Sequence, residues 1–251
     1  MLAFDSPFIV FVAAFVAQWL AAYAGDLLRK KARPLREGER ADFDIIRTAT
    51  LTLLGLIIGF SFAMAVSRYD QRKNYEEAEA NAISTEYVRA DLLPVDGASS
   101  LRELLKKYLD QRISFYLASD GRQVSQINAD TEKLQTELWS AVVRAAATQQ
   151  TFVMTLAVAG MNDVLNSQGY TQAAWWNRIP VAAWALMGLI ATSCNLLLGY
   201  GERRTSAFVL VLPLIVSVSF FLIANIDSPR GGFIQVLPQN LIALSQSLKA
   251  H

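Results

Sequence analysis

The stretch "IIRTATLTLLGLIIGFSFAMAV", residues 45–66, decides the fold class of this 251-residue chain. Arg47 is its only charged residue, and about 20 apolar helical residues suffice to cross the hydrocarbon core of a bilayer. Between Phe60 and Leu93 the chain has neither Gly nor Pro, and Pro94 supplies the first stop. The pattern predicts one helix that begins near Ile45, crosses the membrane and continues to Leu93.

Three further runs are long and apolar enough to cross a membrane: Pro7–Gly25, Ile179–Tyr200 and Ser206–Ile226. The composition agrees, with 53% hydrophobic residues, only 18% charged residues and a mean hydropathy of +0.28. Soluble domains carry about 25% charged residues. We therefore predict an all-α integral membrane protein with four transmembrane helices in a two-plus-two arrangement and an extramembrane helical insert between the second and third.

The predicted division has four parts: residues 1–66 with the first two spans, 67–178 as the insert, 179–226 with the last two spans, and 227–251 as a C-terminal turn and short amphipathic segment. The insert should be a helical bundle. One stripe at helical spacing predicts a long helix running towards residues 152–165: Ile127, Thr131, Leu134, Leu138 and Val142.

The Lys and Arg residues of the short loops predict the orientation in the cell (inner) membrane. Two loops on one side hold nine of them: Arg29, Lys30, Lys31, Arg33, Arg36, Arg40, Arg47, Arg203 and Arg204. Because positive loops stay in the cytoplasm, the termini and the insert are predicted to lie outside it.

Small and hydroxyl residues follow one face of the second span: Thr48, Thr52, Gly55, Gly59, Ala63 and Ser67. Such a face lets another helix approach closely. Three interpretations stay open at this point: packing within one subunit, an interface between subunits, or a narrow pore lined by threonine and backbone.

Other polar residues lie in or near the membrane. No Asp, Glu, Lys or Arg falls at the centre of a predicted span, which disfavours a proton-coupled carrier. Gln18, Asn195 and Asn225 are the polar exceptions, and we interpret Asn195 and Asn225 as hydrogen-bond partners between helices rather than ligands.

Beyond the second span, Asn81, Thr85 and Arg89 recur every four residues beside small side chains. This pattern fits a solvated or bundle-packed helix, or a polar network at a subunit or domain contact, which we favour. We interpret Glu76 and Glu77 as ordinary surface charge.

Residues for chemistry are scarce. Cys194 is the only cysteine and His251 the only histidine, so we expect no catalytic triad, metal site or cofactor. The net charge of +1 gives no footprint for nucleic acid. The expected partners are the lipid bilayer, further copies of the chain and, for a channel, inorganic ions.

Four stretches resemble the bacterial bestrophin-like domain family: "LLGLIIGFSFAMAVSRYDQR" at 53–72, "EANAISTEYVRADLLP" at 79–94, "LKKYLDQRISFY" at 105–116 and "IDSPRGGFIQV" at 226–236. The layout is also similar to that of the true bestrophins. That resemblance implies a pentameric anion channel whose second helix lines the pore.

A channel whose second helix borders the pore is the leading hypothesis, and a non-conducting scaffold or sensor whose insert binds a partner is the alternative. A pore requires the Thr52–Gly59 face to be free for a central axis. A scaffold would bury that face against its own subunit. A carrier or an enzyme is disfavoured.

Overall fold

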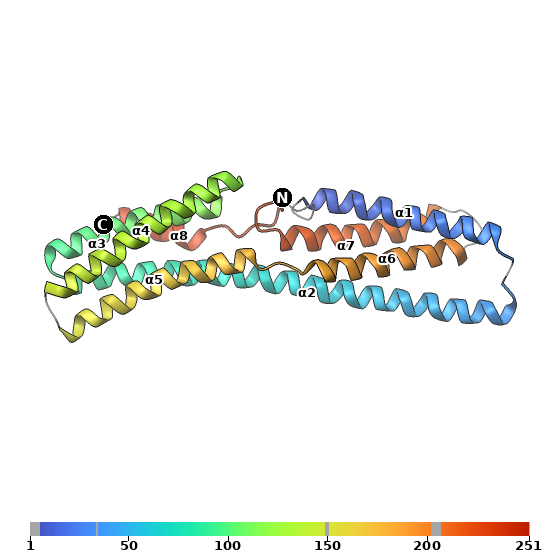
Figure 1. Ribbon diagram of the computed structural model, residues 1–251, viewed down its shortest axis with the longest axis horizontal. Helices are drawn as coiled ribbons and strands as arrows, with labels where there is room; N and C mark the ends of the chain where they lie inside the picture. The colour runs from blue at the N-terminus through green and yellow to red at the C-terminus, as the bar shows by residue number, and fades with distance from the viewer. Residues whose placement is uncertain (1–5, 34, 149–150, 202–206, 251) are drawn as a thin grey trace. The chain divides into compact units, whose positions relative to one another are not determined.

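The computed structural model describes residues 6–33, 35–148, 151–201 and 207–250, and every regular element in these residues is a helix (Figure 1). The elements in chain order are α1 (Pro7–Lys31), α2 (Glu37–Arg89), η2 (Ala90–Leu92), α3 (Val95–Leu117), α4 (Gly121–Thr148), α5 (Phe152–Trp176), α6 (Val181–Gly201), η3 (Ala207–Leu210), α7 (Val211–Asp227) and α8 (Gln239–Lys249). The prediction of an all-α chain is confirmed.

Several helices have the length and composition of membrane spans. Three helical stretches, Pro7–Lys31, Gly38–Leu92 and Phe152–Gly201, are long and apolar enough to cross a bilayer, and Val211–Asp227 is a shorter apolar helix. The chain is therefore a membrane protein built from apolar helices. The count of four spans stays a prediction, and Ser206, where the fourth was expected to begin, lies outside the described residues.

Helix α2 is a single helix of 53 residues, as the absence of Gly and Pro after Phe60 predicts. It starts at Glu37, earlier than expected. At its end the N–H of Leu93 donates to the carbonyl of Ala90 and closes the short 3-10 turn η2. Pro94 then prevents the helix from continuing.

The chain divides into two compact units, and the first comprises Met1–Tyr69 and Arg178–Gln235. In this unit α1 packs against α6 and α7. The backbones of α1 and α6 touch where Gly25 and Gly199 lie, because a Cβ at Gly25 would collide with the carbonyl of Leu196, and a Cβ at Gly199 with the carbonyl of Ala22. Small residues at such contacts are typical of packed membrane helices.

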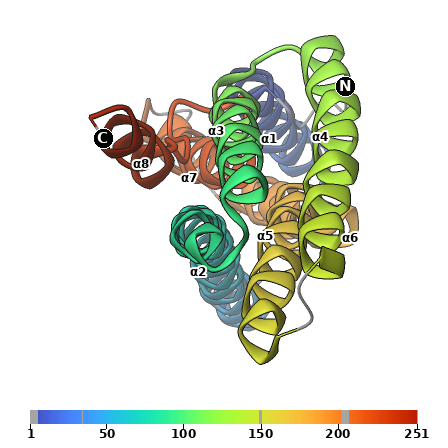
Figure 2. The same ribbon diagram turned by 90° about the vertical axis from the view of Figure 1, so that its left-hand side faces the viewer.

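The second unit comprises Asp70–Asn177 and Val236–His251. Here α3 packs against α4 and α8, and α4 packs against α5 (Figure 2). Its core contains the fully buried Leu101, Leu105, Leu138 and Val142. Of the stripe predicted on α4, Leu134 alone is only partly buried.

One expectation for the insert is wrong. The predicted helix running on towards residues 152–165 is two helices, since α4 ends at Thr148 and α5 begins at Phe152 with Thr151 in an extended conformation before it. Neither Gly nor Pro occurs at this break, so the sequence contains no local signal that predicts it.

Candidate functional site

The described residues leave the small-residue face of α2 uncovered. All six of its members are exposed: Thr48, Thr52, Gly55, Gly59, Ala63 and Ser67. A Cβ added at Gly55 or Gly59 would meet no atom within 4 Å. The interpretation as packing within one subunit therefore finds no partner among the described residues.

The side of α2 that packs against its own unit is a different one. Leu54, Ser61 and Ala65 are buried, with exposed fractions of 2%, 5% and 0%. Leu54 and Ala65 belong to a core with residues of α6 and α7 such as Met187 and Ile223. At about 100° per residue the buried positions lie roughly 150° around the helix from the small-residue face.

One hydroxyl group on this face donates a hydrogen bond to a backbone carbonyl of α2. Thr52 Oγ1 donates to the carbonyl of Thr48 at 2.9 Å. A threonine in this arrangement can still accept a hydrogen bond or contact a cation, because the donated proton leaves the oxygen lone pairs available.

Two of the polar residues predicted in the membrane meet between helices. Asn195 Nδ2 of α6 donates to Gln18 Oε1 of α1 at 3.0 Å, and Gln18 Nε2 donates to Ser217 Oγ of α7 at 3.2 Å. All three side chains are buried. They form a hydrogen-bonded contact of three helices, and nothing in it resembles a binding site.

Asn225 has a different role at the end of α7. Its Oδ1 accepts a hydrogen bond from the N–H of Ile234 at 2.9 Å, and a Cβ at Gly232 would collide with its carbonyl. Asp227 accepts from the N–H of Ile179 with both carboxylate oxygens at 3.2 Å. These contacts order the segment after α7, which was predicted as a turn.

The outer part of α2 carries charged residues that are buried in the second unit. Arg72, Glu76, Glu79 and Glu86 are each at most 1% exposed. With Ile83 they are spaced by four, three, four and three residues, which places them on one face of the helix. We call these four charged residues the buried charged stripe.

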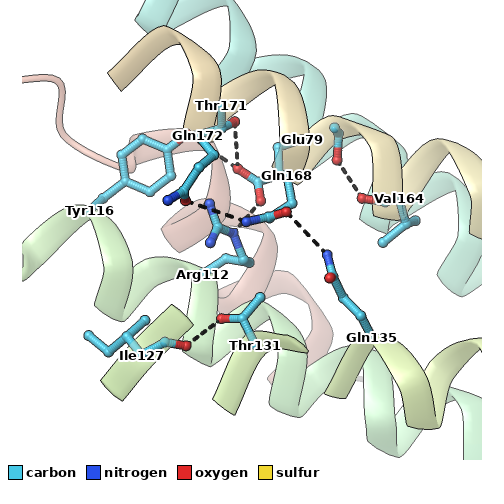
Figure 3. Close-up of polar contacts among 11 residues, drawn as sticks. Glu79, Arg112, Tyr116, Ile127, Thr131, Gln135, Val164, Gln168, Thr171 and Gln172 are labelled. Carbon is cyan, nitrogen blue, oxygen red and sulfur yellow. Dashed lines mark hydrogen bonds and ion pairs between the residues drawn. The ribbon is translucent and has the colours of Figure 1, made fainter. Parts of the chain in front are cut away.

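Glu79 is the centre of a network that joins three helices (Figure 3). Its carboxylate forms an ion pair with Arg112 of α3 and accepts hydrogen bonds from Tyr116 at 3.3 Å and from Thr171 of α5 at 3.1 Å. The guanidinium of Arg112 lies 4.5 Å from the centre of the Phe115 ring. Buried charge is tolerated here because it is paired.

The network changes the acidity of its members. Burial favours loss of the Arg112 charge, but the carboxylate of Glu79 outweighs it and raises the Arg112 pKa. Burial, and secondarily the Glu79 charge, raises the pKa values of Tyr108 and Tyr116 well above their ordinary range. The arginine stays charged and the phenols stay neutral at physiological pH, which suits a structural role.

Glu76 and Arg72 hold the ends of two other helices. Glu76 Oε1 accepts from the N–H groups of Asn240 and Leu241 at 2.9 and 3.0 Å, so it caps the start of α8. Arg72 donates to the carbonyls of Ala174 and Asn177 at the end of α5, at 3.2 and 3.4 Å. The interpretation of Glu76 as surface charge is wrong, because these polar partners compensate its burial.

Glu86 has no such partners. Both of its carboxylate oxygens are buried and accept no hydrogen bond among the described residues. It lies against α5, where a Cβ at Gly160 would collide with Glu86 and with the guanidinium of Arg89. Burial raises the pKa of Glu86 to about 8, although the charge of Arg89 acts against it.

The three residues predicted as a polar face of the insert do not come together. Asn81 and Thr85 are exposed, whereas Arg89 is partly buried against Gly160. A subunit contact through Asn81 and Thr85 stays a prediction. Sequence reasoning missed the buried charged stripe, because its spacing of four and three residues does not distinguish a buried charged face from a solvated one.

Among the described residues, no group of three or more His, Cys, Asp or Glu side chains could hold a metal ion. Cys194 is buried in the core of the first unit. The arrangement therefore offers two features for function: the free face of α2 in the membrane segment and the charged network of the insert.

Comparisons with known proteins agree with this fold. A family model described as Bestrophin-like domain matches residues 44–241. The crystal structure of a bacterial bestrophin homologue from Klebsiella pneumoniae carrying a point mutation has a TM-score of 0.65 at 13% identity, over 97% of each chain. A crystal structure of a bacterial bestrophin homologue from Klebsiella pneumoniae obtained by Zn-SAD phasing has a TM-score of 0.64 at 14% identity, over 96% of this chain and 95% of that one. No curated protein matches the sequence.

Proposed function

We propose, since the chain belongs to the bestrophin-like domain family, that it is a homo-oligomeric ion channel of the cell membrane in which α2 borders the pore. The observation that carries the proposal is the free face of α2, defined above by Thr48, Thr52, Gly55, Gly59, Ala63 and Ser67. It lies on the opposite side of the helix from the residues that pack against its own unit.

The chemistry of this face suits a water-filled axis better than lipid. Lipid-facing positions of membrane helices are apolar and bulky, as at the exposed Leu53, Phe60 and Met64 of the same helix. Gly, Ala, Ser and Thr instead allow several copies of a helix to approach one another around an axis. The scaffold alternative would bury this face in its own subunit, which the described residues do not do.

The proposed topology follows the loop charges. The four spans are α1, the inner part of α2, α6 and α7, with the insert of residues 67–178 between the second and the third. Arg33 in the loop between α1 and α2, with Arg29 at the end of α1 and Arg40 at the start of α2, favours a cytoplasmic side for this end of the two helices. Arg203 and Arg204, which support the same side, lie outside the described residues. A reporter fused after Gly121 should then be active only outside the cytoplasm, and cytoplasmic activity would reverse the orientation.

Cysteine substitution tests the pore directly. The single native cysteine, Cys194, is buried, so it should not react with a water-soluble thiol reagent. In the reconstituted full chain, a charged methanethiosulfonate should react with Thr52→Cys and reduce the ionic current. The matched control is Leu53→Cys, which is also exposed but lies about 100° around the helix.

Two outcomes decide the proposal. Loss of current in Thr52→Cys together with unchanged current in Leu53→Cys supports it. No current from protein that is shown to be oligomeric, or equal effects at both positions, would refute a pore at this face.

A further inference from the structure

A basic cavity lies in the first unit, where α1 and α6 end and α2 begins. Its volume is about 420 Å³, within the range of ordinary ligand pockets. The side chains that decide its chemistry are those of Arg29, Arg33, Arg40, Phe43, Asp44 and Tyr200. Three guanidinium groups and one carboxylate of the described residues therefore line one cavity.

The donors of these arginines are only partly used. Arg29 pairs with Asp26 at 2.6 Å, but its Nε is buried and has no hydrogen-bond partner among the described residues. Arg33 pairs with Glu39 at 2.6 Å. Arg40 forms no ion pair with any described residue. Because a guanidinium offers five N–H donors, one carboxylate contact leaves most of them available.

The acidic residues that lie near the cavity among the described residues already have cationic partners. Asp44, the only carboxylate among the described lining residues, pairs with Arg47 at 3.1 Å. Asp26 is shared between Arg29 at 2.6 Å and Lys30 at 2.5 Å. Among the described lining residues, three arginines and one carboxylate thus leave an excess of positive charge that an anion could neutralise.

The position favours an anion that belongs to the membrane. The cavity lies at the ends of α1 and α6, two helices with the composition of membrane spans. Phe43 and Tyr200 pack together with ring centres 5.5 Å apart, and aromatic side chains are enriched at the level of the headgroups. Basic pockets between membrane helices on the cytoplasmic side bind anionic headgroups.

We infer that this cavity binds a phosphate group, that of an anionic phospholipid headgroup. Arg33 and Arg40 contact its oxygens, since the planar guanidinium fork matches phosphate geometry. Phe43 and Tyr200 cover the glycerol side. The inference does not depend on ion conduction and would hold for a non-conducting protein as well.

The test uses the purified full chain in detergent, titrated with phosphatidylglycerol, with phosphatidylcholine and with inorganic phosphate. Bound lipid is counted by native mass spectrometry. Arg33→Gln/Arg40→Gln removes two arginines from the cavity, and Lys31→Gln/Arg36→Gln removes two positive charges from the same loop outside its lining. Arg40→Gln alone is included because it breaks no ion pair among the described residues.

We expect phosphatidylglycerol to bind the native chain and the Lys31→Gln/Arg36→Gln control with similar affinity. Affinity should fall by about fivefold for each arginine removed from the cavity, since each basic residue contributes about 1 kcal/mol. Equal losses in the two double variants, or phosphatidylcholine binding as tightly as phosphatidylglycerol, would overturn the site. Tight binding of inorganic phosphate that Arg40→Gln abolishes would keep the phosphate site but overturn a lipid as its source.

Discussion

The buried pair of Glu79 and Arg112 gives the sharpest test of how the insert is held together. Both side chains are completely buried. In Arg112→Met the carboxylate keeps the hydrogen bonds from Tyr116 and Thr171 but loses the only cation that pairs with it among the described residues. Leaving one member of a buried ion pair without its partner costs about 3–5 kcal/mol.

The double variant Glu79→Gln/Arg112→Met should recover much of this loss. The Gln amide oxygen still accepts hydrogen bonds from Tyr116 and Thr171, and no uncompensated charge remains in the core. We therefore expect the double variant to be more stable than Arg112→Met alone. The resulting coupling energy should be on the order of 2–3 kcal/mol, the upper part of the range for contacting residues.

Thermal denaturation of the full chain in detergent measures these differences. Trp175 is a suitable fluorescence reporter, because its ring lies 5.0 Å from the ring of Phe115 and 5.5 Å from that of Tyr116. A loss of 3–5 kcal/mol should lower Tm by about 10 °C in a chain of this size. The matched control is the exposed pair Asp130 and Lys133, where the same cycle should give less than about 1 kcal/mol.

Strict additivity of the two single substitutions would refute this account of the network. The same holds if the exposed control pair shows the same coupling as the buried pair. In either case the ion pair would be incidental, and the packing of the surrounding aromatic rings would hold α2, α3 and α5 together.

Three further substitutions test other parts of the chain. Glu86→Gln should raise Tm more at pH 9 than at pH 5. The pKa of Glu86 in the folded protein, about 8, lies above its ordinary value of 4.5, so the native protein loses stability as pH rises from 4.5 to 8. An equal gain in Tm at both pH values would contradict this. Glu76→Gln should weaken the cap of α8 by about 1 kcal/mol and accelerate amide exchange there, but not in α4. Gly59→Leu should abolish the oligomer in size-exclusion chromatography. It should not lower the Tm of the monomer, because a Cβ at Gly59 meets no described atom within 4 Å. An intact oligomer would exclude close contact between helices of different subunits at this face.

The helical architecture was predictable because it depends on local signals. The length of the apolar runs and the stretch without Gly or Pro between Phe60 and Leu93 predict α2 as one helix, and the structure confirms it. The stripe from Ile127 to Val142 likewise predicts the buried side of α4. Periodicity reports which face of a helix is apolar, and this information lies within one turn of each residue.

The charged network could not be predicted in the same way. Carboxylates are exposed in most proteins, so Glu76 and Glu79 look like surface residues until their partners are known. Those partners are distant in the sequence: Arg112 is 33 positions from Glu79, and Asn240 is 164 positions from Glu76. Only the fold brings them together.

The buried positions of α2 also indicate where this helix leaves the bilayer. Leu54, Ser61 and Ala65 are followed at the same helical spacing by Arg72, Glu76 and Glu79, so the buried side stays the same while its chemistry changes from apolar to charged. Charged side chains at the centre of a bilayer cost several kcal/mol, whereas buried charges in a water-surrounded bundle need only partners. We infer that the membrane surface crosses α2 between Ala65 and Arg72.

Spin labels at the exposed positions Ala63 and Asn74 lie on either side of this boundary. In monomers, the label at Ala63 should be relaxed mainly by oxygen dissolved in the lipid. The label at Asn74 should be relaxed mainly by a water-soluble agent. Equal exposure of both labels to the water-soluble agent in non-conducting monomers would place the boundary elsewhere.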